Sequence, residues 1–312
     1  MNKKRTYFYY IIHYFLCMMM FFFLMFFFLM AQTTTADFAV IGDWGGHGGS
    51  THQRRVAAAM LSRNPSFVIS TGDNFYPNGI KHAKDPKIER LWTNIYETNK
   101  RPWISVLGNH DYLSNASAQV AIEHSNWIMP SRYYSITYND TTFWCLDTTP
   151  WMPFDYVEVH HERRGGVSDA SRHDNEAQRA LAPKQIKWLQ NSIARSTSKR
   201  KYIVGHHPLW TYGYHRFANH SRLVDVILDV HEKHNVTAYL CGHDHSMQHI
   251  YQFGLHQFLS GAGSSSYRVY DGPGLQYKCD VTDHGFLMVY DNGTASYIDE
   301  HNRVLYHSGK FV

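Results

Sequence analysis

Five short apolar runs along the chain end close to a glycine that is followed by a polar, metal-competent side chain. Each run has the length and composition of a buried strand. The runs are 38–41 before Gly42-Asp43, 67–69 before Gly72-Asp73, 103–107 before Gly108-Asn109-His110-Asp111, 202–204 before Gly205-His206-His207, and 238–241 before Gly242-His243-Asp244-His245. Ligands of sheets of this kind bind outside the carboxyl ends of the strands. The five ends therefore predict one shared site, with Asp73 near its middle.

Helical patterns separate the first three of these strands. Residues 53–63 and 86–98 carry apolar side chains at helical spacing, and Ser50 or Thr51 can cap the first of the two helices. The order strand, helix, strand, helix, strand is typical of a parallel sheet covered by helices.

The pattern changes after residue 130. Residues 132–138 and 142–146 alternate around Asn139-Asp140, which predicts a hairpin. We interpret residues 155–180, which hold few apolar side chains, as a long exposed loop, and we expect Pro183 to open the helix that follows. The remaining expected elements are a strand over 201–204, a helix over 221–233, a strand over 238–241, and short strands over 250–253, 256–259, 285–290, 295–298 and 303–306.

The first 36 residues have the pattern of a secretory leader. Lys3-Lys4-Arg5 precede an apolar run from Tyr14 to Met30, and a stretch of small and polar residues follows. The run is also long enough to span a bilayer, so an uncleaved type II anchor is the alternative. We expect residues 1–36 to be a signal peptide or signal anchor, and residues 37–312 to be a single catalytic domain. The expected location is the secretory pathway, with the protein secreted, lysosomal or vacuolar, or held at the cell surface.

The sequons also favour the secretory pathway, and the number of cysteines limits disulfide pairing. Five Asn-X-Ser/Thr sequons follow the leader, at Asn115, Asn139, Asn219, Asn235 and Asn292, and together they favour a glycoprotein. Of the four cysteines, Cys17 lies in the leader, so three remain, and an odd number excludes complete internal pairing. We expect Cys145 and Cys241, which lie inside apolar runs, to be small buried side chains.

The charge balance argues against nucleic acid as a partner. The formal net charge is +4, and without Lys3, Lys4 and Arg5 it falls to +1, with 27 basic against 26 acidic residues. This near-neutral balance gives no electrostatic reason to expect nucleic acid as a partner. The 22 histidines are unusual in number, and several of them follow the predicted strands.

The residue types at the strand ends suit metal ions. Carboxylate, amide oxygen and imidazole nitrogen are ligands for first-row metals. Tyr76, three residues after Asp73, adds a hard anionic oxygen that favours ferric iron over zinc or magnesium. A carboxylate can bridge two cations, and two-metal sites hold a phosphoryl group and generate hydroxide at moderate pH. The chain supplies enough ligands for two ions.

The five blocks, in this order, resemble the motifs of the metallophosphoesterases. Tyr76 and the reading Gly42-Asp43-Trp44-Gly45 narrow the resemblance to the purple acid phosphatases, and to their small tartrate-resistant, type 5 branch. The resemblance covers roughly residues 37–300. It implies a four-layer α/β/β/α sandwich, in which helices flank two mixed sheets. It also implies an acid phosphatase that hydrolyses phosphate monoesters by attack of a metal-bound hydroxide at a binuclear centre.

The resemblance implies a role for each residue of the blocks. The ligands of Fe(III) would be Asp43, Asp73, Tyr76 and His245. The ligands of a second metal, Fe(II), Zn(II) or Mn(II), would be Asp73, Asn109, His206 and His243, with Asp73 bridging. The catalytic residues would be His110, which contacts phosphate, His215, which donates a proton, and Asp111, which orients His110. The 155–180 stretch would occupy the place of the family's regulatory loop, although the two cysteines that mammalian enzymes pair near it are not both present.

Two other functions remain open at this point. One is a phosphodiesterase or nucleotidase of the same superfamily, against which Tyr76 argues. The other is a non-hydrolytic, iron-containing surface protein, against which intact Asn109 and His110 argue. We expect a monomer whose partners are phosphate monoester substrates, and which meets a membrane only through an uncleaved N-terminal segment.

Overall fold

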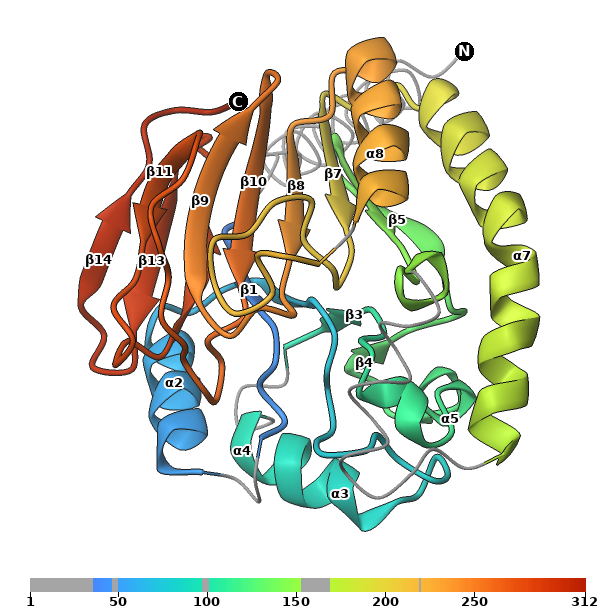
Figure 1. Cartoon of the computed structure of the whole chain (residues 1–312). Coiled ribbons are helices and arrows are strands. Elements are labelled where there is room, and N and C mark those ends of the chain that lie inside the picture. The colour runs from blue at the N-terminus through green and yellow to red at the C-terminus, as the bar shows by residue number, and fades with distance from the viewer. Residues whose placement is uncertain (1–35, 47–49, 97–100, 153–168, 219) are drawn as a thin grey trace, which may run out of the picture. The chain divides into compact units, whose positions relative to one another are not determined.

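Two mixed sheets of seven strands each form the centre of the fold, with helices on their outer faces (Figure 1). The computed structural model describes residues 36–312 except 47–49, 97–100, 153–168 and 219. The strand order is β14-β13-β12-β1-β2-β3-β4 in the first sheet and β11-β9-β10-β8-β7-β6-β5 in the second. The leader expected over residues 1–36 lies, apart from residue 36, outside the described part of the chain.

The first sheet carries three of the five predicted strand ends. Its strands are β1 (Phe38–Ile41), β2 (Phe67–Ser70), β3 (Trp103–Ser105), β4 (Trp127–Ile128), β12 (Gly285–Val289), β13 (Ala295–Asp299) and β14 (Val304–His307). The first four run parallel, and β12 to β14 add an antiparallel half beyond β1. In register, Ile41 pairs with Ser70 and Ser70 with Ser105. The three parallel strands therefore end level, and the loops after them leave one edge of the sheet.

The second sheet carries the other two ends. Its strands are β5 (Tyr134–Tyr138), β6 (Thr141–Cys145), β7 (Arg200–Val204), β8 (Ala238–Cys241), β9 (Met247–Gln252), β10 (Leu255–Ser260) and β11 (Leu275–Lys278). Strands β5 and β6 form the hairpin predicted around Asn139-Asp140. Strands β7 and β8 are parallel, with Val204 opposite Leu240, so the loops that begin with Gly205 and Gly242 also leave one edge.

The inner faces of the two sheets form the main core. Phe38 of β1 contacts Phe143 of β6 and Tyr202 of β7, with ring centroids 5.2 and 5.5 Å apart and edge-to-face geometry. Aromatic pairs of this kind contribute about 0.5–1.5 kcal/mol beyond the burial of their apolar area. The Phe38 contacts join the sheets face to face and leave both outer faces to be covered by helices.

Helices cover the outer faces of both sheets, which gives four layers. On the first sheet, α2 (Thr51–Ser62) begins at Ser50, whose hydroxyl accepts a hydrogen bond from the Gln53 amide. On the second sheet, α7 (Asp169–Ala194) and α8 (Ser221–His234) bury Leu189, Leu223 and Ile227 against the strands. The α/β/β/α sandwich that the resemblance implied is confirmed.

The helical segment after β2 is less regular than its periodicity suggests. Over 86–96, the single helix predicted for 86–98 is divided into α3 (Pro86–Ile88), a π-helical turn (Glu89–Thr93) and α4 (Asn94–Tyr96), and residues 97 and 98 lie outside the described part of the chain. Short helical turns also follow β3 and β6: a 3-10 turn (Asp111–Leu113), α5 (Ser117–Val120) and a second 3-10 turn (Thr149–Trp151).

The loop prediction for residues 155–180 was wrong over its second half. Residues 169–180 belong to α7, and Pro183 lies inside this helix rather than at its start. Seven of these twelve residues are alanine, arginine, glutamine or glutamate, which favour helix even where few side chains are apolar. Pro183 lacks an amide hydrogen and so removes one backbone hydrogen bond from the helix, which the helix tolerates. The first half of the predicted loop, residues 155–168, lies outside the described residues.

Two further observations concern cysteines and membranes. Cys145, Cys241 and Cys279 are buried and unpaired with one another, which confirms the expectation for the first two. Among the described residues, no helix has the length and apolar content that crossing a membrane requires.

Candidate metal centre

The seven predicted metal ligands lie together, where the loops after β1, β2, β3, β7 and β8 meet. They form two groups. In the first group, the Tyr76 hydroxyl lies 3.0 Å from Asp43 Oδ1, 2.8 Å from Asp73 Oδ2 and 2.9 Å from His245 Nε2. In the second group, Asn109 Oδ1 lies 3.0 Å from His206 Nε2 and 2.9 Å from His243 Nδ1.

Asp73 belongs to both groups. Its Oδ2 atom faces Tyr76, and its Oδ1 atom lies 3.5 Å from His206 Nε2. Ligand atoms of Asp43, Asp73 and His206 all fall within 4.8 Å of one another. This is the geometry that a bridging carboxylate requires.

The ligand side chains are almost entirely removed from solvent. Asp43 and His206 are fully buried, and Asp73 is 1% exposed. Burial of charged or polar groups is costly unless they are paired or bind metal. Two carboxylates and a phenol enclosed together thus favour a cation at this place.

Backbone conformation at the site is unusual for non-glycine residues. Asp43, Asp73 and His243 have φ values of 56°, 51° and 69°, in the left-handed region. Such positions cost free energy and cluster at functional sites. In each case a sharp turn directly after a strand directs the side chain to the centre of the site.

Two glycines allow the loops to approach one another. A Cβ on Gly108 would overlap the Asp73 carboxylate. A Cβ on Gly72, whose φ is +96°, would lie 2.8 Å from His206 Nδ1. Glycine is therefore required at both positions for the strand ends to meet.

The acid–base properties of the first group also fit a cation. Burial, followed by the charges of Asp43 and Asp73, raises the pKa of Tyr76 well above its usual value. A phenolate forms at this position only in the company of a positive ion. Burial alone would raise the pKa of Asp73, but nearby His206 and His110 and the Tyr76 hydrogen bond lower it overall, which keeps this carboxylate ionised.

A second layer of contacts orients the ligands. His206 Nδ1 donates to the Thr71 carbonyl across 2.8 Å, which directs Nε2 toward Asn109 and Asp73. His207, the other member of the pair, is buried and bonds through Nδ1 to the Thr148 hydroxyl at 2.8 Å. The geometry supports the interpretation of His207 as structural.

Asp111 joins the loops that carry the ligands. Its buried carboxylate accepts hydrogen bonds from the amides of Gly108 at 2.9 Å and Asn74 at 3.2 Å, and from Gln119 Nε2 at 2.6 Å. Burial and the charge of Asp73 raise the pKa of Asp111 to about 7. Asp111 thus orients the His110 segment through the backbone of the loop.

The two predicted catalytic histidines line the open side of the site. Both are partly exposed, unlike most of the ligands. His110 Nδ1 donates to the Pro77 carbonyl across 2.6 Å, and its ring lies 4.5 Å from the Tyr76 ring. The ring of His215 lies 4.1 Å from that of His243, next to the second group.

Asp244 has a structural role that the sequence pattern did not indicate. Its buried carboxylate accepts hydrogen bonds from the Thr211 hydroxyl, from the Tyr214 amide at 3.0 Å and from the His215 amide at 3.4 Å. Asp244 therefore holds the loop that presents His215. Asp244 lies between two predicted metal ligands, His243 and His245, and this position could have marked it as functional. The sequence does not indicate which loop its carboxylate holds.

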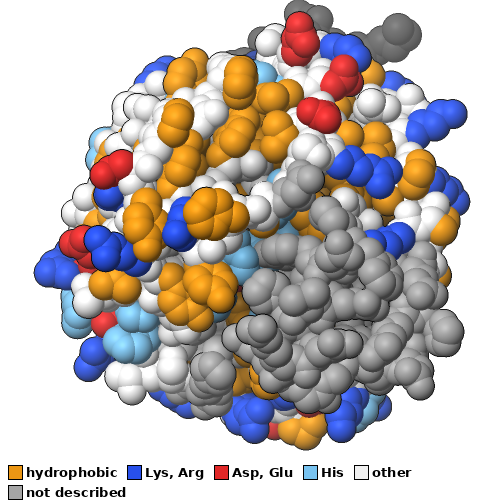
Figure 2. Space-filling view, in the orientation of Figure 1, with side chains coloured by type: hydrophobic (Ala, Val, Ile, Leu, Met, Phe, Trp, Pro, Cys, Tyr) orange, Lys and Arg blue, Asp and Glu red, His pale blue; other side chains and the backbone are white. Residues whose placement is uncertain are grey.

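Aromatic side chains border the site. Tyr267 stacks on His245 with ring centroids 4.8 Å apart, and Tyr214 lies 5.0 Å from His215 and 5.7 Å from Tyr267. Tyr214 and Tyr267 are 60% and 40% exposed. Figure 2 shows apolar side chains gathered beside histidines and basic side chains on this view of the molecule. Tyr214 and Tyr267 form the rim of the site. This rim can stack against a planar group of a bound molecule.

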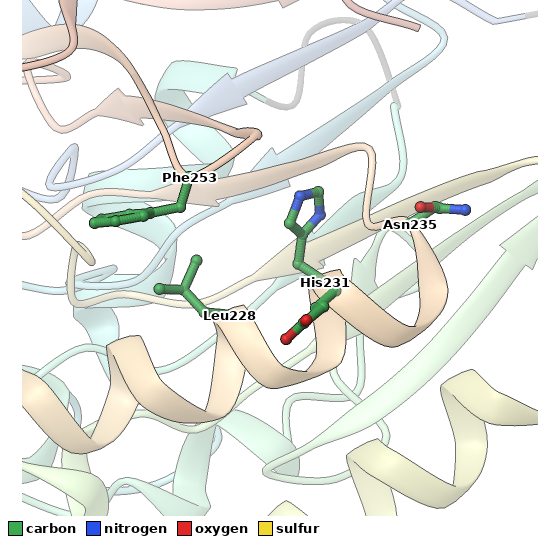
Figure 3. A pocket seen from close by; sticks show the side chains of 5 residues that line it. Leu228, His231, Asn235 and Phe253 are labelled. Atoms are coloured by element: carbon green, nitrogen blue, oxygen red, sulfur yellow. The ribbon is translucent and has the colours of Figure 1, made fainter.

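A separate pocket lies between α8 and the turn that joins β9 to β10 (Figure 3). Its lining residues are Leu228, His231, Glu232, Asn235 and Phe253. It shares no residue with the candidate metal centre, and we assign no chemistry to it.

Taken together, the donor atoms fit two metal ions. The first group offers two carboxylates, a phenol and an imidazole, which suits a hard trivalent ion. The second offers a shared carboxylate, an amide oxygen and two imidazoles, which suits a divalent first-row ion.

Comparison with known proteins agrees with this chemistry. Residues 36–247 match the family model described as calcineurin-like phosphoesterase. Purple acid phosphatase 7 of Arabidopsis thaliana is 32% identical over 289 residues, which cover 87% of this chain and 84% of the relative. Tartrate-resistant acid phosphatase type 5 of Sus scrofa is 30% identical and covers 73% of this chain and 69% of its own length.

The fold has a counterpart among solved structures. GAP50, described as the anchor in the inner membrane complex of Plasmodium, superposes with a TM-score of 0.69 at 23% identity and covers 87% of both chains. Identity at this level supports similarity of fold alone.

Proposed function

The chain belongs to the calcineurin-like phosphoesterase family and, within it, to the purple acid phosphatases, and we propose that it hydrolyses phosphate monoesters in acid at a centre of Fe(III) and one divalent metal. The observation that carries this proposal is the position of the Tyr76 hydroxyl, within 3.0 Å of Asp43, Asp73 and His245. A phenolate oxygen among these ligands favours the ferric ion. The second ion of the proposal is Fe(II), Zn(II) or Mn(II).

The metal ions, when bound, supply Lewis-acid activation of water and of the phosphoryl group. Two histidine side chains of the protein supply the other contributions to the reaction. The His110 ring, whose Nδ1 hydrogen is directed to Pro77, can place its other nitrogen against a phosphoryl oxygen when protonated. This stabilises the negative charge that develops on the phosphoryl group in the transition state.

His215 lies on the opposite side of the site, beside His243. Its backbone is held by Asp244, and its partly exposed ring can deliver a proton to a departing alkoxide. Loss of a general acid typically costs about 10²–10⁴-fold in rate. The two histidines thus have different roles, one toward the phosphoryl group and one toward the leaving group.

Rates on a monoester and a diester with the same chromogenic leaving group test the reaction class. We expect the monoester to have the higher kcat/KM, with its maximum below pH 7. A higher kcat/KM for the diester would instead favour the phosphodiesterase alternative. Absence of hydrolysis with two metals bound would favour a non-hydrolytic role.

We further propose that the protein is an N-glycosylated monomer of the secretory pathway. Support comes from the leader pattern and from four sequon asparagines that are exposed in the described structure, namely Asn115, Asn139, Asn235 and Asn292. Treatment of the secreted protein with an N-glycosidase should lower its mass. An unchanged mass would contradict this part of the proposal.

A further inference from the structure

A second cluster of metal-competent side chains lies outside the centre described above. It consists of His52 in the first turn of α2, His284 just before β12 and Glu300 just after β13. His52 Nδ1 lies 2.8 Å from Glu300 Oε2, and the two imidazole rings stack with centroids 3.9 Å apart. One ligand atom from each of the three residues falls within 4.8 Å of the others.

The sheet places two of these residues side by side. Gly285 pairs with Asp299 across β12 and β13, and the amide of Glu300 donates to the carbonyl of His284 at 2.8 Å. Backbone hydrogen bonding at the end of the sheet therefore holds His284 and Glu300 next to each other. The third residue, His52, comes from α2, which packs on the same strands.

Glu300 is placed as a ligand would be. Its side chain is only 7% exposed, and its two oxygens face different partners. Oε2 faces His52, and Oε1 lies 3.7 Å from an Arg55 nitrogen and 3.5 Å from His301 Nε2. Burial of a carboxylate is costly unless it is paired or binds metal, so the enclosed Glu300 side chain favours a cation here.

The chemistry of the three side chains matches zinc. Two imidazoles and one carboxylate form a common ligand set for this ion, which completes a tetrahedron with water. His284 Nδ1 lies 3.1 Å from the Thr282 carbonyl, to which it can donate, and this leaves Nε2 of the same ring for an ion.

We propose that His52, His284 and Glu300 bind a zinc ion separate from the phosphatase centre. The His52 side chain is 44% exposed, so its ring can tilt out of the stack toward an ion, and water can reach the fourth position. The ion would join the start of α2 to strands β12 and β13. Zinc would therefore protect the fold against heat without taking part in phosphate ester hydrolysis.

The experiment uses the full-length protein with its phosphatase centre loaded. Zinc is added by equilibrium dialysis, and total metal per chain and the thermal midpoint are measured before and after. We expect one additional metal ion per chain and a higher midpoint. His52→Gln and His284→Gln should each weaken this uptake at least about tenfold, the scale seen when even an outer contact of a metal site is lost.

His82→Gln is the matched control, because His82 is an exposed histidine of another segment and should leave zinc uptake unchanged. The comparison uses proteins of equal starting metal content, so its outcome does not depend on the identity of the ions in the phosphatase centre. Absence of additional zinc in the wild type would overturn the proposal. Equal uptake by the wild type and both cluster variants would overturn it too, and the stacked pair would then be a structural contact only.

Discussion

The backbone amide of His110 donates a hydrogen bond to Oδ1 of Asp73 across 2.8 Å. This bond joins the loop after β3 to the one carboxylate that faces both ligand groups. Asn109 is the preceding residue, so its amide oxygen and the His110 ring are both positioned relative to Asp73. The two ligand groups therefore form one structural unit rather than two independent sites.

The first prediction follows from the place of Asn109 between His206 and His243. Asn109→Ala removes the oxygen that both imidazoles face, at 3.0 and 2.9 Å. We expect the protein to lose its divalent metal and kcat to fall at least about 100-fold, beyond the usual cost of an outer contact. Metal analysis and steady-state kinetics check this. The exposed Asn94→Ala variant serves as control, and full activity with a single metal would refute the two-metal account.

The second prediction concerns Asp244 as a positioning residue. Asp244→Ala releases the amides of Tyr214 and His215 and should lower kcat toward the level of His215→Ala. Because both changes act on the same proton donor, the double variant should be little worse than either single one. The alkaline limb of the pH–rate profile, where a proton donor loses its proton, and the effect of leaving-group pKa should change alike in both. Additive losses would mean that Asp244 acts elsewhere.

A third prediction concerns the exposed tyrosines of the rim. Tyr214 is 60% exposed and lies against His215, where the leaving group of a bound ester would extend. Tyr214→Ala should lower kcat/KM for aryl phosphates by up to about tenfold, the scale of one aromatic pair, and leave alkyl phosphates nearly unchanged. Tyr138→Ala, on the distant β5–β6 hairpin, is the control. Equal losses on both substrate classes would argue against stacking.

The fourth prediction is a dependence of stability on pH. Burial and the charge of His256 lower the pKa of His249 from 6.5 to about 3. Between these values the unfolded chain binds a proton that the folded chain does not, so stability falls as pH decreases from about 6.5. The slope for one such group is at most about 1.4 kcal/mol per pH unit.

Urea unfolding at pH 7, 6 and 5 measures this effect. His249→Gln should lose less stability over this range than the wild type, because the variant has no imidazole to protonate at this place. His82→Gln, at an exposed position, should behave as the wild type. Parallel losses in all three proteins would assign the acid sensitivity to other groups.

Much of the fold and site was predictable because a parallel sheet delivers its chemistry in order. A glycine follows each of the five strands within three residues, and the next side chains, such as Asp43 and Asp73, must project at the same edge. The hairpin at Asn139-Asp140 was predictable for a similar reason, since alternation and turn residues are local signals. None of these inferences required knowledge of distant contacts.

The errors arose where local signals were weak or misleading. The start of α7 was missed because few of its residues are apolar and because Pro183 suggested a helix start. Strand β4 has two residues, too few to form a pattern. The partners of Asp244 and the cluster of His52, His284 and Glu300 depend on contacts between segments far apart in the chain.

The measurement that tests the central claim most directly is the visible absorption spectrum of the purified protein, together with its metal content. The account predicts a broad band in the green-to-yellow region and about two metals per chain, one of them iron, because Tyr76 would bind Fe(III) as a phenolate. The band should be lost in Tyr76→Phe. A colourless wild-type protein that holds two zinc or manganese ions would contradict the ferric centre and leave a metallophosphoesterase of another kind.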